Sequence, residues 1–255
     1  MVSGLGQVLE RFGYLAAERP TYKASLLRSI FDTNALTLAE MMTRRMLDGL
    51  EPAEIAEVCA WFSYDREAPL RALPLTNRLR RLHEEVLGLQ TTVLDEERKA
   101  HIEVSRLINA DLKGVALAWA YGDDLGEIAE RSRIVEGDLV GLLQKSLDIL
   151  GQLRAALARA DVPPRRSDRL DVADLLERIE QADRLLRRGV VEESYRWAIS
   201  GPPEETQGAD DWVLPPEPPP GPPPTERRPP PRPRRGGPSR STKPRGKLRP
   251  KRPGR

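Results

Sequence analysis

The side chains best suited to chemistry in this chain are cations gathered near its C-terminal end. Residues 227–255 contain thirteen Lys and Arg and no Asp or Glu. Such a run contacts nucleic-acid phosphates in a salt-sensitive, sequence-independent way, so we predict that it binds nucleic acid. The alternative is a solubilising terminus extended by its own charge. The candidate phosphate-binding residues are Arg227, Arg228, Arg232, Arg234, Arg235, Arg240, Lys243, Arg245, Lys247, Arg249, Lys251 and Arg252.

The chain offers few residues for catalysis. Its 255 residues contain neither a G-x-x-x-x-G-K-[ST] phosphate loop nor a DExH or DEAD box. Nucleotide hydrolysis therefore lacks the backbone amides, the Lys and the Mg²⁺-binding carboxylate that it needs. His83 and His101 lie eighteen residues apart and Cys59 is the single cysteine, a spacing and a count that do not suit a zinc site. We predict that the chain is not an enzyme and holds no metal or cofactor.

The net charge of +2 hides two different segments. Residues 201–226 contain six acidic and no basic residues, so residues 1–200 carry a net charge of about −5 against +13 for residues 227–255. No run of eighteen apolar residues and no cationic start followed by an apolar core is present. With one cysteine, these features predict a cytoplasmic protein that does not span a membrane or form an internal disulfide.

Residues 1–200 have the apolar spacing of helices almost throughout. We expect helices over 5–12, 36–47 and 51–62, with an extended segment or hairpin at 14–23. The clearest pattern starts at Leu75 and continues through Val93 to Leu107, a helix of about 50 Å with a break near 94–99. The pattern fits either a coiled-coil seam or the long helix of a bundle, and we favour the bundle.

The remaining residues divide into a helical part and a Pro-rich part. Residues 113–153 predict a helix, a turn, a short helix, a second turn and a long helix. A last helix is expected from Ser167 and Asp168, with the fold ending near Ile199. Residues 201–255 contain eighteen Pro and few large apolar residues, so a Pro-rich linker over 201–226 and a disordered basic tail over 227–255 are expected.

Several motifs occur together in a recognisable order. The chain contains LDGLEPAE at 47–54, then WAYG at 119–122, EGD at 136–138 and LLRRGVV at 185–191. In this order they resemble the C-terminal helical domain (DSHCT) of Ski-type and HelY-like superfamily 2 DExH RNA helicases. RFGYL at 11–15 and TYKASLLRSIF at 21–31 resemble the end of the winged-helix domain that precedes it. The resemblance implies a partial winged-helix segment at 1–33 and an all-α bundle at 34–200.

The resemblance also implies a function. In the family, the long helix after E-G lines the RNA path with basic side chains, which correspond here to Gly141, Gln144 and Lys145; only Lys145 is basic. We expect an accessory module of an RNA helicase that binds RNA through the tail and works with a separately encoded motor or is a piece of one. The alternative is a non-enzymatic scaffold or regulator whose bundle binds protein.

One further reading of the central helices is possible. Residues 125–143 could form a DNA-binding helix-turn-helix, in which the second helix enters the major groove. That helix begins with Glu136, Gly137 and Asp138, and phosphates would repel the two carboxylates. We therefore expect these helices to pack inside the bundle instead.

Overall fold

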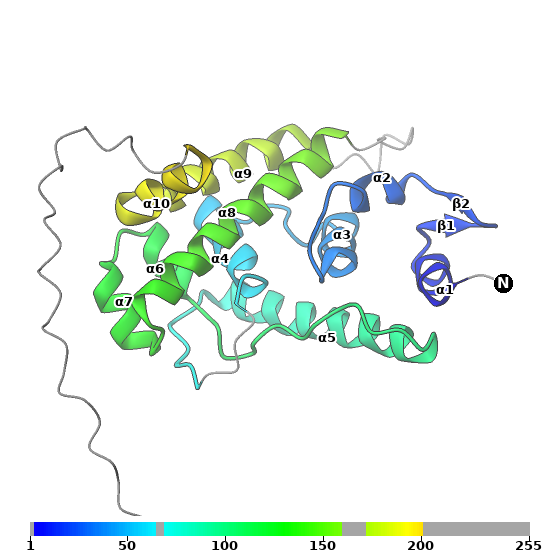
Figure 1. The fold of residues 1–255 in the computed structure, drawn as a ribbon, viewed down its shortest axis with the longest axis horizontal. Coiled ribbons are helices and arrows are strands. Elements are labelled where there is room, and N and C mark those ends of the chain that lie inside the picture. The colour runs from blue at the N-terminus through cyan, green and yellow to red at the C-terminus, as the bar shows by residue number, and fades with distance from the viewer. Residues whose placement is uncertain (1–2, 65–68, 160–171, 201–255) are drawn as a thin grey trace, which may run out of the picture. The chain divides into compact units, whose positions relative to one another are not determined.

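The computed structural model describes residues 3–64, 69–159 and 172–200, and it is all-α apart from one short hairpin (Figure 1). The predicted linker and tail at 201–255 lie outside the described residues. Within those residues, no helix is long and apolar enough to cross a membrane. The elements are α1 (Gly4–Arg11), β1 (Leu15–Ala16), β2 (Arg19–Pro20), α2 (Lys23–Leu27), α3 (Ala35–Thr43), α4 (Pro52–Trp61), α5 (Asn77–Lys99), α6 (Val115–Ala120), α7 (Leu125–Ser132), α8 (Glu136–Arg159), α9 (Val172–Leu186) and α10 (Gly189–Ser200).

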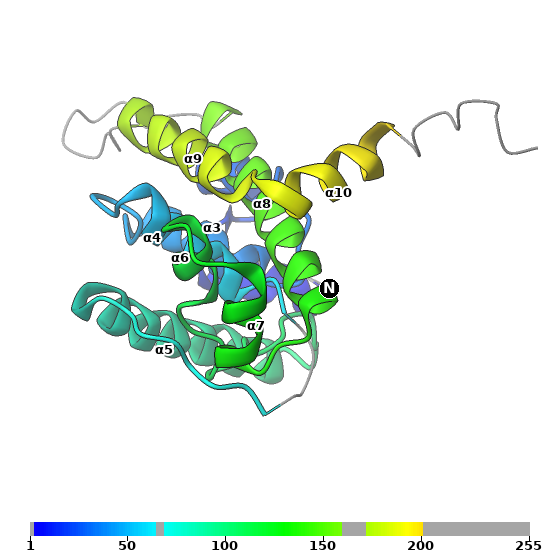
Figure 2. The same ribbon diagram turned by 90° about the vertical axis from the view of Figure 1, so that its left-hand side faces the viewer.

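Helix α4 forms the centre of the core. All of its residues from Ala53 to Trp61 are buried, including Cys59. It packs against α6, α8 and α9, while α8 and α9 also pack on each other. Two perpendicular views show α4 between the α8–α9 pair and α5 (Figure 2). A helix with apolar residues on all of its sides must be enclosed by other elements in this way.

The first elements follow the sequence prediction closely. The helix expected at 5–12 is α1, and the hairpin expected at 14–23 is the antiparallel pair β1–β2, in which Leu15 faces Pro20. Lys23 ties this region to the bundle, because its Nζ lies 2.6 Å from Glu40 Oε1 in α3 and 2.9 Å from the Phe12 carbonyl oxygen. That residues 1–33 belong to a winged-helix domain stays a prediction.

Helix α5 ends where the sequence suggested a break, but the helix does not resume. It stops at Lys99, and the backbone reverses at His101, which has φ +56°. Buried Glu97 then accepts hydrogen bonds from the backbone N–H groups of Val104 and Ser105 and from the Ser105 hydroxyl. These contacts hold the following residues extended, so the prediction of a helix continuing to Leu107 is wrong.

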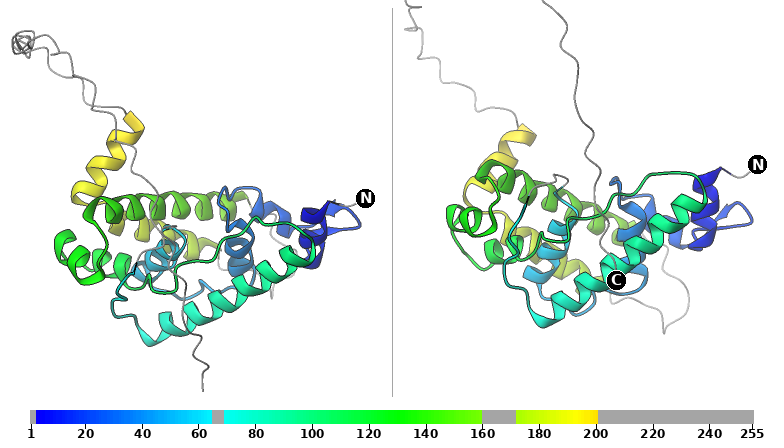
Figure 3. Two further views of the ribbon diagram at one scale, coloured as in Figure 1. Left: turned by 60° about the horizontal axis from the view of Figure 1, so that its bottom comes forward. Right: turned by 90° about the horizontal axis from the view of Figure 1, so that it is seen from below.

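The extended segment 102–109 runs back beside α5 (Figure 3). Gln90 of α5 donates to the Arg106 carbonyl oxygen at 2.6 Å and accepts from the Ile108 N–H at 2.9 Å. The amide therefore satisfies a donor and an acceptor of an unpaired backbone, which would otherwise carry a desolvation cost. Two polar side chains of α5, Glu97 and Gln90, thus position this segment.

One other predicted helix ends earlier than expected, and the chain forms one helix more than was predicted before residue 200. Helix α3 stops at Thr43, and the chain turns at Arg45, which has φ +58°. At the other end of the bundle, α9 stops at Leu186 and a separate helix, α10, begins at Gly189, whose φ is +49°. A left-handed residue cannot continue an α-helix. The predicted start of the last helix at 167–168 lies outside the described residues.

Candidate nucleic-acid interface

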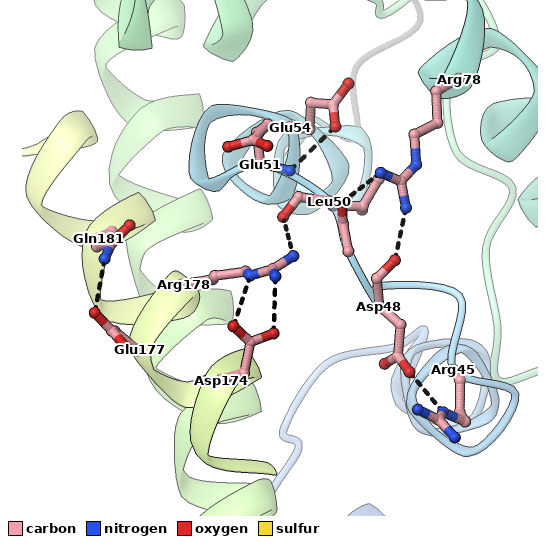
Figure 4. Close-up of polar contacts among 11 residues, drawn as sticks. Arg45, Asp48, Leu50, Glu51, Glu54, Arg78, Asp174, Glu177, Arg178 and Gln181 are labelled. Carbon is pink, nitrogen blue, oxygen red and sulfur yellow. Dashed lines mark hydrogen bonds and ion pairs between the residues drawn. The ribbon is translucent and has the colours of Figure 1, made fainter. Parts of the chain in front are cut away.

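The LDGLEPAE segment at 47–54 has a structural role at the start of α4. Glu51 and Glu54 form a capping box at the start of α4 (Figure 4). Arg78 of α5 donates to the carbonyl oxygens of Asp48 and Gly49, and Arg178 of α9 donates to that of Leu50 at 3.1 Å. These hydrogen bonds join the start of α4 to two other helices.

Trp119 joins α6 to the end of α9. Its indole Nε1–H donates to the Leu186 carbonyl oxygen at 3.0 Å, and the Arg188 guanidinium lies 3.5 Å from the centre of its ring. Arg188 also donates to the Trp119 and Asp123 carbonyl oxygens. Both ends of this pairing come from family-like motifs, WAYG and LLRRGVV, and both of them serve packing.

Glu57 of α4 holds the start of α6. Its carboxylate accepts from the N–H groups of Gly114 and Leu117, at 2.5 and 3.0 Å, and from the Trp61 indole at 2.8 Å. Burial raises the pKa of this carboxyl from 4.5 to about 7, although the three donors oppose the shift. We call the contacts of Arg78, Arg178, Glu57, Trp119 and Arg188 the α4 clamp.

The α7–α8 pair packs inside the bundle. Asp124 caps α7 by accepting from the N–H groups of Gly126 and Glu127. The helix packs on α6 and α8, and Arg133, with φ +63°, makes the turn into α8. Glu136 and Asp138 occupy the first turn of α8, where they stabilise the helix dipole. Because α7 packs on both α6 and α8, the α7–α8 pair is part of the helical bundle, as expected.

Helix α8 carries the positions that resemble the family's RNA-facing residues. Gly141 is exposed, whereas Gln144 and Lys145 are half-buried. The Lys145 side chain is 41% exposed, and its Nζ lies 4.0 Å from Asp32 Oδ2, the outer limit of an ion pair. Of the three positions, therefore, only Lys145 can bring a cation to this face of α8.

A groove of about 330 Å³ opens beside Lys145. It lies where four segments meet: the turn after α2, the end of α4, the extended segment 102–109 and α8. The lining includes two side chains that the sequence analysis did not single out, Phe31 and Arg106. Phe31 ends the TYKASLLRSIF stretch, but no periodic pattern or charge cluster marks either residue as a ligand contact. The predicted site residues Arg227 to Arg252 lie outside the described residues.

Comparison with protein families agrees with this geometry. The family model of the DSHCT (NUC185) domain matches residues 17–194. The chain belongs to the DSHCT family. The match begins within the β1–β2 turn and ends in α10, so it includes the whole α4 clamp and all of α8.

Several helicases are similar to this DSHCT chain. The "Probable helicase HelY" of Mycobacterium leprae is 29% identical over 150 residues, which cover 54% of the chain and 16% of the helicase. The protein of the same name from Mycobacterium tuberculosis is 28% identical over 178 residues, covering 60% and 20%. The "DExH-box ATP-dependent RNA helicase DExH9" of Arabidopsis thaliana is 25% identical over 157 residues, covering 59% and 16%. The chain thus spans a fifth or less of these relatives, in their DSHCT region and not in the ATPase core.

Proposed function

We propose that the chain serves as the DSHCT module of an RNA-helicase system, contacting RNA and partner while a DExH motor hydrolyses ATP. The observation that carries this proposal is the restriction of the helicase match to the DSHCT region, together with a fully formed helical core there. The described residues supply a scaffold and an open face on α8. The motor and its substrate are the parts that the proposal adds.

Complementation tests this role directly. A HelY-type motor core from which the DSHCT segment has been removed is assayed for RNA-stimulated ATP hydrolysis with and without this chain. The proposal expects the chain to raise the motor's turnover or RNA affinity and to show no hydrolysis alone. A Trp119→Ala chain, which breaks the α4 clamp, is the control for a folded module. No effect of the intact chain on any such core would contradict the role.

We further propose that the tail at 227–255 supplies most of the RNA affinity. Its charge of +13 contrasts with about −5 for residues 1–200, and α8 has one cation at its three candidate positions. If about six cations engage a single strand, the slope of log affinity against log salt should be roughly −4. RNA affinity of the full chain and of residues 1–200, measured across a salt series, checks this. Equal affinities would return the RNA site to the bundle.

A second candidate function is a scaffold or regulator that binds a protein through the bundle. The loss of charge at Gly141 and Gln144 favours it, because a neutral helix face is better suited to protein contact than to phosphate contact. In the complementation assay, this function predicts stable association with the motor core but no change in its RNA affinity.

A further inference from the structure

The groove beside Lys145 carries an exposed aromatic ring on a firmly held turn. The Phe31 side chain is 82% exposed, yet its backbone N–H donates to Gln152 Oε1 of α8 at 2.7 Å. Three residues further on, Asn34 Oδ1 accepts from Gln90 Nε2 at 2.9 Å and from the Arg106 N–H at 3.2 Å. The turn is thus tied to α8, α5 and the extended segment, and the exposure of the ring belongs to an ordered conformation.

Apolar and cationic side chains line the groove together with the Phe31 ring. Leu107 is 64% exposed and extends the apolar surface. Arg106 is also exposed, and no side-chain hydrogen bond or ion pair joins it to the described part of the chain. Lys145 reaches Asp32 only at 4.0 Å, and the Lys145 side chain is 41% exposed whereas that of Asp32 is 9% exposed. At this separation, the outer limit of an ion pair, the Lys145 ammonium remains accessible to another anion from solvent. An exposed ring therefore lies beside two available cations.

This combination fits a single-stranded nucleic acid better than a protein segment. Sites for single strands pair aromatic rings, on which bases stack, with cations that follow the phosphates. The one carboxylate in the lining, Asp32, already accepts from the Asn34 N–H at 2.8 Å. A groove of about 330 Å³ is at the small end of ligand sites, suited to one nucleotide.

We propose that this groove holds one nucleotide of a single-stranded RNA, with its base stacked on Phe31 and its phosphates paired with Arg106 and Lys145. The inference rests on the proposed function, because it assumes that the chain contacts RNA. It adds a second contact point, separate from the tail, that selects unpaired over duplex RNA, since a paired base has no free face to stack on the ring.

The experiment uses the full chain and a short oligouridine, at raised salt to weaken contacts made by the tail. Phe31→Ala should weaken binding roughly 5- to 100-fold, whereas Phe31→Trp, which keeps a stacking ring, should retain it. Tyr121→Ala removes an aromatic ring that is 65% exposed outside the groove and is the matched control.

Arg106→Gln and Lys145→Gln should each make the salt slope shallower by about 0.7, and Arg154→Gln on α8 should have a smaller effect.

Photocrosslinking locates the contact independently. Iodouracil-substituted oligouridine should crosslink to the peptide that contains Phe31, and the crosslink should vanish in Phe31→Ala. Crosslinks confined to residues 227–255, with Phe31→Ala binding normally, would overturn the groove while leaving the proposed RNA role intact. Absence of RNA binding by the full chain would remove both. Unchanged RNA affinity with weakened binding of a motor core would make the groove a protein-docking surface instead.

Discussion

The α4 clamp and the groove beside Lys145 are built on opposite principles. In the clamp, Glu57 accepts three hydrogen bonds inside the core, and Trp119 is buried with its indole N–H satisfied. In the groove, Phe31 is largely exposed and Lys145 has an ion-pair partner only at 4.0 Å. The polar groups of the clamp stabilise the fold, whereas the Lys145 ammonium in the groove is available to a ligand.

Three of the family-like motifs fall on one side of this division. LDGLEPAE, WAYG and LLRRGVV all contribute to the clamp. The groove depends on Phe31, the last residue of the TYKASLLRSIF stretch, and on Arg106, which no motif includes, and α8 beside it lacks two of three expected cations. The residues of these three motifs thus hold the helices together. The proposed ligand contacts of this chain involve other residues, namely Phe31, Arg106 and Lys145.

Trp119→Ala should have the largest effect, because it breaks the clamp. It removes a buried ring, the hydrogen bond to Leu186 and the stacking partner of Arg188, and should lower the free energy of unfolding by about 3–5 kcal/mol. Urea titration followed by circular dichroism measures the change. Tyr121→Ala, two residues along, should change it by under about 0.5 kcal/mol. Similar losses in both variants would show that the clamp does not concentrate stability.

Glu57→Gln tests the electrostatics of the clamp through pH. The folded-state pKa of Glu57, raised by burial to about 7, lies above its unfolded value. The folded protein therefore binds this proton more tightly, and the stability that it contributes is present below pH 4.5 and lost as pH rises through about 7. The stability of the wild type relative to Glu57→Gln should fall by up to about 3 kcal/mol over this interval.

Unfolding free energies of both proteins, measured from pH 4.5 to 8, check this dependence. His83 titrates in both proteins, with a pKa lowered by burial to about 4, so its contribution cancels in the difference. A difference that stays constant, or grows with pH, would mean that the three donors keep the Glu57 carboxylate ionised in the folded protein.

Gly49→Ala tests a single backbone position in the clamp. Gly49 has φ +66°, and a Cβ there would lie 3.3 Å from Arg78 Nη2. A left-handed conformation costs a residue with a Cβ roughly 1–2 kcal/mol, so the variant should be less stable by about that amount. Gly49→Asn, which tolerates this conformation better, should lose less. Thermal unfolding measures the stability of the two variants. Equal melting temperatures for Gly49→Ala and Gly49→Asn would contradict a left-handed backbone conformation at this position.

Gly141 on α8 offers the smallest effect and the sharpest contrast with the clamp. Nothing lies within 4 Å of a Cβ added there, and Gly in a helix interior costs about 0.5–1 kcal/mol relative to Ala. Gly141→Ala and Gly141→Arg should therefore both stabilise the chain. Only the Arg variant should bind RNA more tightly, with a salt slope steeper by about 0.7. Equal RNA affinity in the two variants would indicate that RNA does not pass this part of α8.

Much of the fold could be predicted from helical spacing, because α1, α4, α6, α7 and α8 begin near Gly, Pro or acidic residues with well-known preferences. Two reversals made by residues other than Gly were missed. Arg45 and His101 both have positive φ, which composition does not reveal. The helix expected through Leu107 failed because Glu97 and Gln90 satisfy an extended backbone from a distance in sequence.

The candidate site was predicted in part. Lys145 was identified by position, but its placement in one groove with Phe31 and Arg106 brings together residues that lie 114 and 39 positions away from it along the chain. Such placement depends on contacts like that of the Phe31 N–H with Gln152, over 121 residues. No periodicity relates such residues. The tail cations were identified by composition alone, and their role stays a prediction.

Cys59 gives the core a reporter of its own motion. It is the single cysteine of the chain, it is 0% exposed on α4, and burial raises the pKa of its thiol. A thiol-specific reagent can reach it only when α4 separates from its neighbours. The labelling rate in native buffer therefore measures how often that opening occurs. A cysteine introduced at an exposed position such as Tyr121 would react far sooner. One fluorophore could therefore be placed on the surface without first removing the native thiol.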